Sequence, residues 1–167
     1  MRNIDFFEHE TEVDANEFGL CDDPDESSKT PAYFDTNPSN ESKWIAHVCN
    51  KASGRIYFIA VDNKIDIRRD NGEMENRCDA ILHDSDHIIF VELKNQAGNW
   101  INHAITQLAT TIDVFKSVHD ITMFRQRLAY ACNKRRPAFA VSHKEDMQRF
   151  KNKYGVRLII SCEITVK

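Results

Sequence analysis

The stretch Cys78–Lys94, CDAILHDSDHIIFVELK, decides how this chain folds, because it holds two apolar runs separated by Asp84-Ser85-Asp86. Two such runs around a short polar turn predict a β-hairpin. Charged residues stand at the ends of the runs: Asp79 in the first, and Glu92 and Lys94 in the second. Charge buried beside a sheet is costly unless a partner compensates it. The hairpin therefore predicts a site where these charges compensate one another or hold an ion.

Strand geometry indicates what that site can do. Side chains alternate along a strand, so Glu92 and Lys94 point to the same face of the sheet, about 7 Å apart. Asp79 stands on the other arm of the hairpin and can lie opposite them. Two carboxylates held together raise each other's pKa unless a cation lies between them. Mg²⁺, or Mn²⁺ in its place, suits such oxygen ligands, with the backbone carbonyl of Leu93 as a third donor.

This combination of groups suits phosphodiester hydrolysis. A bound divalent ion makes its water more acidic and offsets charge that develops on phosphorus. Lys94 then supplies a compact cation that can position the attacking water or stabilise the transition state.

The rest of the chain predicts a mixed α/β fold, with a mixed central sheet flanked by helices. Apolar periodicity and turn residues such as Asn71-Gly72 and Gly155 mark its elements. Helices are predicted over residues 39–53, 101–115, 120–133 and 144–154, and strands over residues 55–61, 77–83, 87–93, 137–142 and 156–166.

The composition is that of one globular domain, with 167 residues of which 41% are hydrophobic and 29% charged. No apolar run approaches the ~20 residues that span a bilayer, and the first residues do not resemble a secretory signal. The five cysteines are widely spaced without a CxxC pair, which disfavours a disulfide framework or a zinc site. We therefore expect a cytoplasmic protein with no membrane partner.

Charge is distributed unevenly along the chain. Residues 1–26 hold ten carboxylates and only Arg2 as a cation, a net charge of −9, while residues 27–167 carry +5. We expect residues 1–40 to form an acidic N-terminal arm and residues 41–167 to form the folded domain. The arm can dock on a protein partner, or it can cover a basic cleft by mimicking phosphates.

A basic stretch without any acidic residue lies between Asp120 and Glu145. One interpretation is a solvated helix face. The other is a surface that contacts nucleic-acid phosphates, because such contacts come from scattered Lys and Arg side chains. The candidate nucleic-acid-binding residues are Arg125, Arg127, Lys134, Arg135 and Arg136.

Asp79, a gap of 12 residues and then Glu92-Leu93-Lys94 on paired strands resemble the PD-(D/E)XK nuclease superfamily, which has the restriction-endonuclease-like fold. The resemblance covers roughly residues 41–143. It implies an αβββαβ core, in agreement with the predicted order of elements. It also implies that Asp79 and Glu92 hold Mg²⁺ and that Lys94 assists the attacking water.

The resemblance implies two further site residues. Glu41, on the predicted first helix, is the candidate for an additional metal ligand. Gln107, on the helix that follows the second strand of the hairpin, is the candidate for orienting the substrate or the catalytic lysine.

Two positions depart from the pattern of the superfamily. Cys78 stands where the name-giving proline would be, at a position that varies widely. Thr111 stands four residues after Gln107, where exonuclease-type members carry a tyrosine, and this argues against that branch.

The three-residue pattern of an acidic residue, any residue and a lysine is not specific by itself, because the chain contains it three times. The copies are Glu41-Ser42-Lys43, Asp62-Asn63-Lys64 and Glu92-Leu93-Lys94. Only the last copy follows a predicted strand with an aspartate and precedes a predicted helix with a glutamine.

These observations predict a Mg²⁺-dependent nuclease that acts on DNA rather than RNA and that cuts duplexes as a homodimer. The alternative from another class is a non-catalytic module on a degenerate nuclease fold, which binds nucleic acid or protein in a defence or mobile-element system. A purely structural ion pair at the end of the sheet, and an inhibitor or immunity protein that binds through its acidic arm, also stay open.

Overall fold

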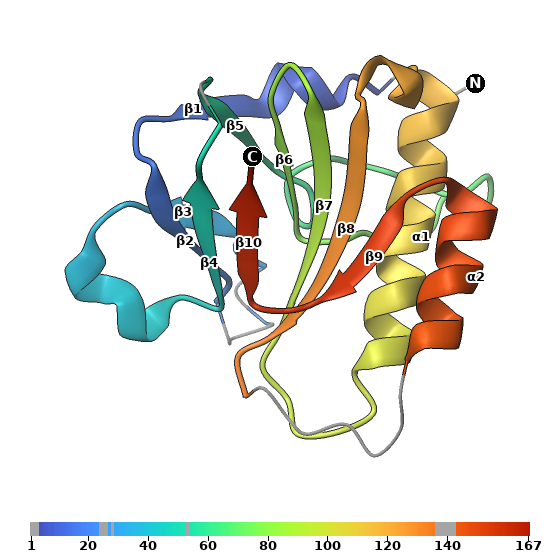
Figure 1. Ribbon diagram of the computed structural model, residues 1–167. Helices are drawn as coiled ribbons and strands as arrows, with labels where there is room; N and C mark the ends of the chain where they lie inside the picture. The colour runs from blue at the N-terminus through green and yellow to red at the C-terminus, as the bar shows by residue number, and fades with distance from the viewer. Residues whose placement is uncertain (1–3, 24–26, 28, 53, 136–142) are drawn as a thin grey trace.

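The computed structural model describes residues 4–23, 27, 29–52, 54–135 and 143–167, which form a mixed α/β fold in three layers. A four-stranded sheet packs on one face of a six-stranded sheet, and two α-helices pack on the other face (Figure 1). Within the described residues, no helix is both long enough and apolar enough to cross a membrane.

The six-stranded sheet has the order β1-β5-β6-β7-β8-β9 and is mixed. Strands β1, β5, β6 and β7 pair antiparallel, and β7, β8 and β9 pair parallel. The bounds are β1 Glu10–Val13, β5 Ile56–Ala60, β6 Ala80–His83, β7 His87–Lys94, β8 Gln126–Asn133 and β9 Arg157–Ile160.

The four-stranded sheet has the order β10-β4-β2-β3 and is also mixed. Only its β10–β4 pair is parallel. The bounds are β2 Glu17–Cys21, β3 Tyr33–Asp35, β4 Ala46–Asn50 and β10 Glu163–Val166.

The predicted hairpin is confirmed as β6 and β7, joined by a short polar turn. The Asp84 carboxylate closes this turn by accepting from the backbone N–H groups of Asp86 and His87 at 2.8 and 2.7 Å. The two strands are buried on both faces, as the continuous apolar runs predict for central strands.

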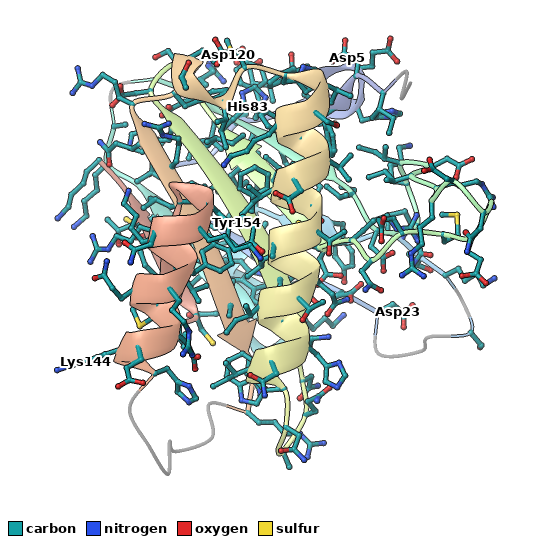
Figure 2. All side chains as sticks on the ribbon, turned by 90° about the vertical axis from the view of Figure 1, so that its right-hand side faces the viewer. Asp5, Asp23, His83, Asp120, Lys144 and Tyr154 are labelled. Carbon is teal, nitrogen blue, oxygen red and sulfur yellow. The ribbon has the colours of Figure 1, made fainter. Side chains whose placement is uncertain are left out.

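Two α-helices cover a single face of the six-stranded sheet. Helix α1 (Ile101–Val118) buries its apolar stripe there, and α2 (Lys144–Tyr154) lies beside it and ends at Gly155, whose φ of 69° suits glycine (Figure 2). Both helices were predicted, but the prediction of helices flanking the sheet is corrected, because the four-stranded sheet covers its second face.

Two other predicted helices are wrong. Residues 39–53 form the 3-10 helix η3 (Pro38–Lys43) followed by β4, and residues 120–133 form the 3-10 helix η4 (Ile121–Met123) followed by β8. Strand β8 has buried residues on both faces and so imitates the apolar spacing of a helix, whereas β4 buries alternate residues and follows the buried Trp44 and Ile45, which suggested a helical face.

The predictions for the end of the chain have two outcomes. The strand predicted over residues 137–142 lies outside the described residues. The strand predicted over residues 156–166 is two strands, since β9 ends at Ile160 and β10 begins at Glu163 in the other sheet.

The N-terminal residues are part of the core, which corrects the prediction of a separate arm over residues 1–40. Strand β1 pairs with β5, and β2 pairs with β3 and β4. Phe6 and Phe18 are fully buried, one in each apolar cluster. The acidic residues that the structure describes in this segment lie on η1 (Phe6–His9), β1, β2 and β3 and beside them, so residue 40 is not a structural boundary.

Candidate functional site

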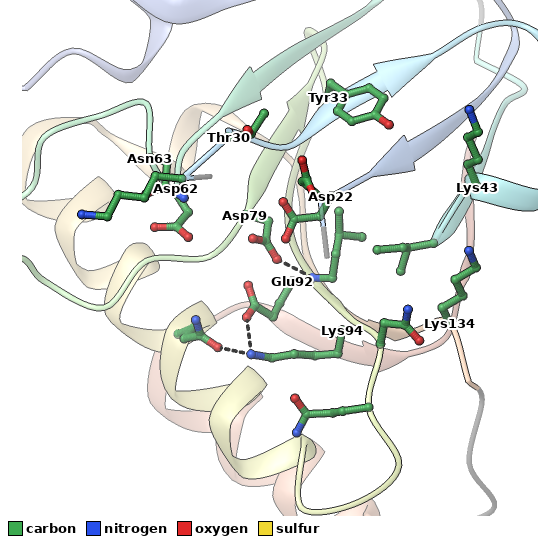
Figure 3. Close-up of a pocket in the computed structure, with 17 residues that line it drawn as sticks. Asp22, Thr30, Tyr33, Lys43, Asp62, Asn63, Asp79, Glu92, Lys94 and Lys134 are labelled. Carbon is green, nitrogen blue, oxygen red and sulfur yellow. Dashed lines mark hydrogen bonds and ion pairs between the residues drawn. The ribbon is translucent and has the colours of Figure 1, made fainter. Parts of the chain in front are cut away.

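A pocket of about 800 Å³ lies at the edge where strands of both sheets meet (Figure 3). Its lining comes from the ends of β2, β5, β7 and β8, the residues just before β3, β4 and β6, and helix α1. Asp79, Glu92, Leu93, Lys94 and Gln107 all line it. The fold therefore brings together five of the residues predicted from the sequence.

The alternation of β7 places the central carboxylate and lysine. Ile88 and Phe90 pack in the cluster beneath the two helices, so Glu92 and Lys94, at the next positions of that face, point toward α1. Gln107 of α1 meets them there: its Oε1 accepts from Lys94 Nζ at 2.8 Å.

Asp79 is fixed by backbone and side-chain contacts. Its Oδ2 accepts from the Leu93 N–H at 2.7 Å, and its own N–H donates to the Val91 carbonyl at 3.1 Å. One residue earlier, the Cys78 N–H donates to Thr111 Oγ1 at 2.7 Å. Thr111 of α1 thus anchors the backbone next to the aspartate.

Glu92 is held by one ion pair and is otherwise unsatisfied. Its Oε2 lies 3.1 Å from Lys94 Nζ, and its side chain is 1% exposed. Its Oε1 is buried and has no hydrogen-bond partner among the described residues. An orphaned carboxylate oxygen at the floor of a pocket is an unusual feature, since buried polar atoms are normally paired.

The two carboxyl groups perturb each other. Burial raises the pKa of Glu92 well above its usual range, and the charge of Asp79 raises it further. Burial also raises the pKa of Asp79, although the neighbouring Glu92 side chain and the hydrogen bond from the Leu93 N–H oppose this effect. The pair carries desolvated negative charge that a cation in the pocket would stabilise.

The donors present fit a hard divalent cation with a small protein ligand set. Within the described residues, no group of three or more His, Cys, Asp or Glu side chains is arranged to hold a metal ion. The available set is the two carboxylates of Asp79 and Glu92, with the Leu93 carbonyl as the expected third donor. Mg²⁺ suits this set, because it commonly binds through one or two carboxylates and retains several waters.

Two further carboxylates in the pocket were not predicted. Asp22 directly follows β2, and Asp62 lies two residues beyond the end of β5. Both occupy strand ends at the edge that carries Asp79. Asp62 directly follows the strand predicted over residues 55–61, so its position could have found it, whereas Asp22 follows β2, which was not predicted. Asp62 is also paired with Arg77, whose Nη2 lies 3.0 Å from its Oδ1.

The carboxyl group of Asp22 has a raised pKa in this pocket. Burial raises its pKa to about 7, and the charges of Asp79 and Asp62 add to that effect. A carboxyl whose folded-state pKa is raised stabilises the fold below its unfolded value of about 3.8, and this stabilisation is lost as pH rises through about 7.

We therefore expect Asp22→Asn to flatten the fall in stability between pH 4 and pH 7. The measurement is the urea midpoint of EDTA-treated protein at several pH values, with the exposed Asp66→Asn as a control that keeps the wild-type slope. Equal slopes in Asp22→Asn and wild type would contradict the expectation.

Glu41, predicted as a further metal ligand, does not reach the pocket. It is exposed in the first turn of η3, because the predicted helix is absent and β4 begins shortly after. Lys43, two residues later, lines the pocket in its place. The structure thus brings a cation where the sequence predicted a carboxylate.

The predicted basic surface is divided between the two ends of β8. Arg125 and Arg127 flank its start, and Lys134 and Arg135 follow its end, so the two pairs lie about 23 Å apart. Arg125 pairs with Asp86 at 3.2 Å, far from the pocket. Among the described members of the set, only Lys134 lines the pocket, while Arg135 donates to Asn95 Oδ1 at 3.3 Å.

Arg136, the last residue of the predicted basic set, lies outside the described residues.

Comparisons of the chain with protein-family models, with curated proteins and with solved structures each gave no match.

Proposed function

We propose that this chain is a Mg²⁺-dependent nuclease that hydrolyses phosphodiester bonds, with DNA as its substrate. One observation carries the proposal. Asp79 and Glu92 are buried side by side at the floor of an open pocket, with a lysine that bridges Glu92 and Gln107. Such a cluster of perturbed carboxylates in a cleft is typical of a catalytic site.

The order of elements around the site supports the proposal. Strands β5, β6 and β7, helix α1 and strand β8 follow one another as three antiparallel strands, a crossover helix and a parallel strand. This order agrees with the βββαβ part of the restriction-endonuclease-like αβββαβ core that the proposal implies. The first helix of that core has no counterpart in the described part of the chain, because η3 and β4 occupy its place.

Each site residue has a role in this mechanism. Asp79 and Glu92, with the Leu93 carbonyl, would hold Mg²⁺, or Mn²⁺ in its place. The ion, when bound, supplies a Lewis acid and an acidified water. Lys94 orients that water and offsets charge on the phosphoryl oxygens, and Gln107 fixes the direction of the lysine side chain through the 2.8 Å hydrogen bond.

One observation favours the non-catalytic alternative. The Lys94 ammonium already neutralises much of the Glu92 charge at 3.1 Å, so the cluster can persist as a structural ion pair without a metal. In that case the chain would bind nucleic acid or protein without cutting it.

Cleavage assays separate these functions. We expect the protein to cut single-stranded DNA, linear duplex or supercoiled plasmid with Mg²⁺ or Mn²⁺, and to cut none of them with EDTA. Re-addition of Mg²⁺ to the EDTA-treated protein should restore the activity, which excludes damage to the fold. Absence of cutting on every substrate, with nucleic-acid binding retained, would contradict a nuclease and favour the binding module.

A further inference from the structure

The pocket has an electrostatic polarity that the catalytic residues do not explain. Figure 3 shows Asp62, Asp79 and Glu92 on the left and in the centre, and Lys43 and Lys134 on the right, while Tyr33 stands at the top of the view, between Asp22 and Lys43. The lining away from Asp62 thus includes Tyr33, Lys43 and Lys134. We refer to these last three residues as the basic rim. None of them belongs to the proposed metal site.

The fold anchors each member of the basic rim. Tyr33 begins β3 and pairs with Cys21 at the end of β2, while Lys43 ends η3. The Lys134 N–H donates to the Lys94 carbonyl at 2.8 Å, which joins the rim directly to the strand that carries the catalytic lysine.

Charges of both signs act on the Cys21 thiol, and Cys21 is the strand partner of Tyr33. Burial raises the pKa of this thiol most, a hydrogen bond with Tyr33 lowers it, the charge of Asp35 raises it, and the charges of Lys134 and Lys43 lower it. The two lysines therefore act on this end of the β2–β3 pair together with an aspartate.

The chemistry of the rim matches a nucleic-acid strand. Tyr33 is one of three large hydrophobic residues exposed in the described structure, at 45%, and its ring borders the pocket. An exposed aromatic ring with lysine side chains along the same pocket can stack a nucleobase while the cations contact the backbone phosphates. Lys43 and Lys134 are both exposed and can reach such phosphates.

We propose that the basic rim is a binding subsite for single-stranded nucleic acid: Tyr33 stacks on an unpaired base, and Lys43 and Lys134 hold the adjacent phosphates. The inference rests on the proposed function, since the strand would then lead to the scissile phosphodiester at Asp79 and Glu92. It adds the substrate class, which the catalytic residues alone do not define.

Two features favour a single strand over an intact duplex. The carboxylates lie below the surface, at 7% and 1% exposure, so the scissile phosphate must enter a pocket of about 800 Å³. A volume of this order suits drug-sized ligands, comparable to one or two nucleotides. In addition, Tyr33 can stack only on a base whose face is not already stacked in a helix.

Binding is tested in EDTA, so that it does not depend on catalysis. The probes are a fluorescein-labelled 12-nucleotide oligothymidylate and a labelled 12-base-pair duplex, followed by fluorescence anisotropy. We expect Tyr33→Leu to weaken oligothymidylate binding roughly 5- to 150-fold, while Tyr33→Phe, which keeps the ring, binds as wild type does.

The lysines are tested through the salt dependence of binding. Each of Lys43→Gln and Lys134→Gln should reduce the slope of log K against log salt concentration by about 0.7. Lys64→Gln is the matched control, because Lys64 is exposed and does not line the pocket. An unchanged affinity in Tyr33→Leu, unchanged slopes in the lysine variants, or a duplex bound as tightly as the single strand would overturn the inference.

A small substrate distinguishes failure of the subsite from failure of the nuclease proposal. Hydrolysis of bis(4-nitrophenyl) phosphate with Mn²⁺ needs the carboxylates but no strand along the rim, so wild type and the Lys64→Gln control should both hydrolyse it. Wild-type protein that binds oligothymidylate through the rim but hydrolyses neither this diester nor DNA would support the subsite and refute the nuclease.

Discussion

Replacing Lys94 with alanine is expected to reduce metal-dependent cleavage by about 10²–10³-fold, the loss typical when one stabilising donor is removed from a catalytic site. Lys94 Nζ lies 3.1 Å from Glu92 Oε2 and 2.8 Å from Gln107 Oε1, so its position is fixed before substrate arrives. A fixed cation stabilises developing negative charge without having to reorganise during the reaction. The measurement is the initial rate of cleavage of labelled DNA at saturating Mg²⁺.

The control for this prediction is Lys64→Ala. Lys64 completes the competing tripeptide Asp62-Asn63-Lys64, but it is exposed and does not line the pocket, so the variant should cut at the wild-type rate. Circular dichroism of both variants shows whether each is folded under the assay conditions. Equal rates for folded Lys94→Ala and Lys64→Ala would show that Lys94 has no part in the chemistry.

The hairpin that carries the site could be predicted because local signals agree there. The apolar runs of β6 and β7 are long enough to be strands, and the Asp84 turn binds two backbone N–H groups of its own loop. The 3.6-residue period predicted helix α1, whose apolar stripe has to face the sheet, while Gln107 became a candidate on this helix only through the family resemblance.

The arrangement of the remaining strands could not be predicted from short stretches of sequence, because it depends on pairing between distant segments. Strand β4 is a strand because β2 and β10 pair with it on both sides, although these segments are distant in the sequence. Strand β8 likewise lies between β7 and β9, and it is largely buried. Periodicity alone cannot distinguish a strand buried on both faces from a helix.

The same limit explains what was missed in the pocket. Asp22 appeared to belong to an acidic arm, because the pairing of β2 with β4 is a long-range contact. Once that pairing exists, the end of β2 and the end of β5 bring Asp22 and Asp62 to the edge that holds Asp79. Glu41 does not reach the pocket because the helix that was predicted to carry it does not form.

Glu92→Gln is expected to abolish detectable metal-dependent cleavage and, in EDTA, to make the protein more resistant to unfolding. The loss of activity follows because an amide has no charge with which to hold a divalent cation. The gain in stability follows because wild-type Glu92 is buried beside Asp79, and both burial and that neighbour disfavour its charged form. In this variant Lys94 keeps its hydrogen bond with Gln107, and its side chain is 19% exposed, so its charge is not buried without a partner.

The sign of the pH effect follows from linkage. Because the folded-state pKa of Glu92 is raised, its contribution to stability is present at low pH and is lost as pH rises through that value. Glutamine does not titrate, so the advantage of Glu92→Gln should be largest at alkaline pH and small near pH 4. Glu145→Gln, at an exposed position of α2, should behave as wild type at every pH.

Mg²⁺ should then reverse the order of stability. A ligand that binds only the folded state stabilises it by about 2.7 kcal/mol when its concentration is 100 times its Kd. Wild-type protein should therefore gain stability with added Mg²⁺, while Glu92→Gln should gain none, so the difference between their urea midpoints shrinks or changes sign. If both respond equally to Mg²⁺, Glu92 is not a metal ligand, and the ion pair with Lys94 is structural.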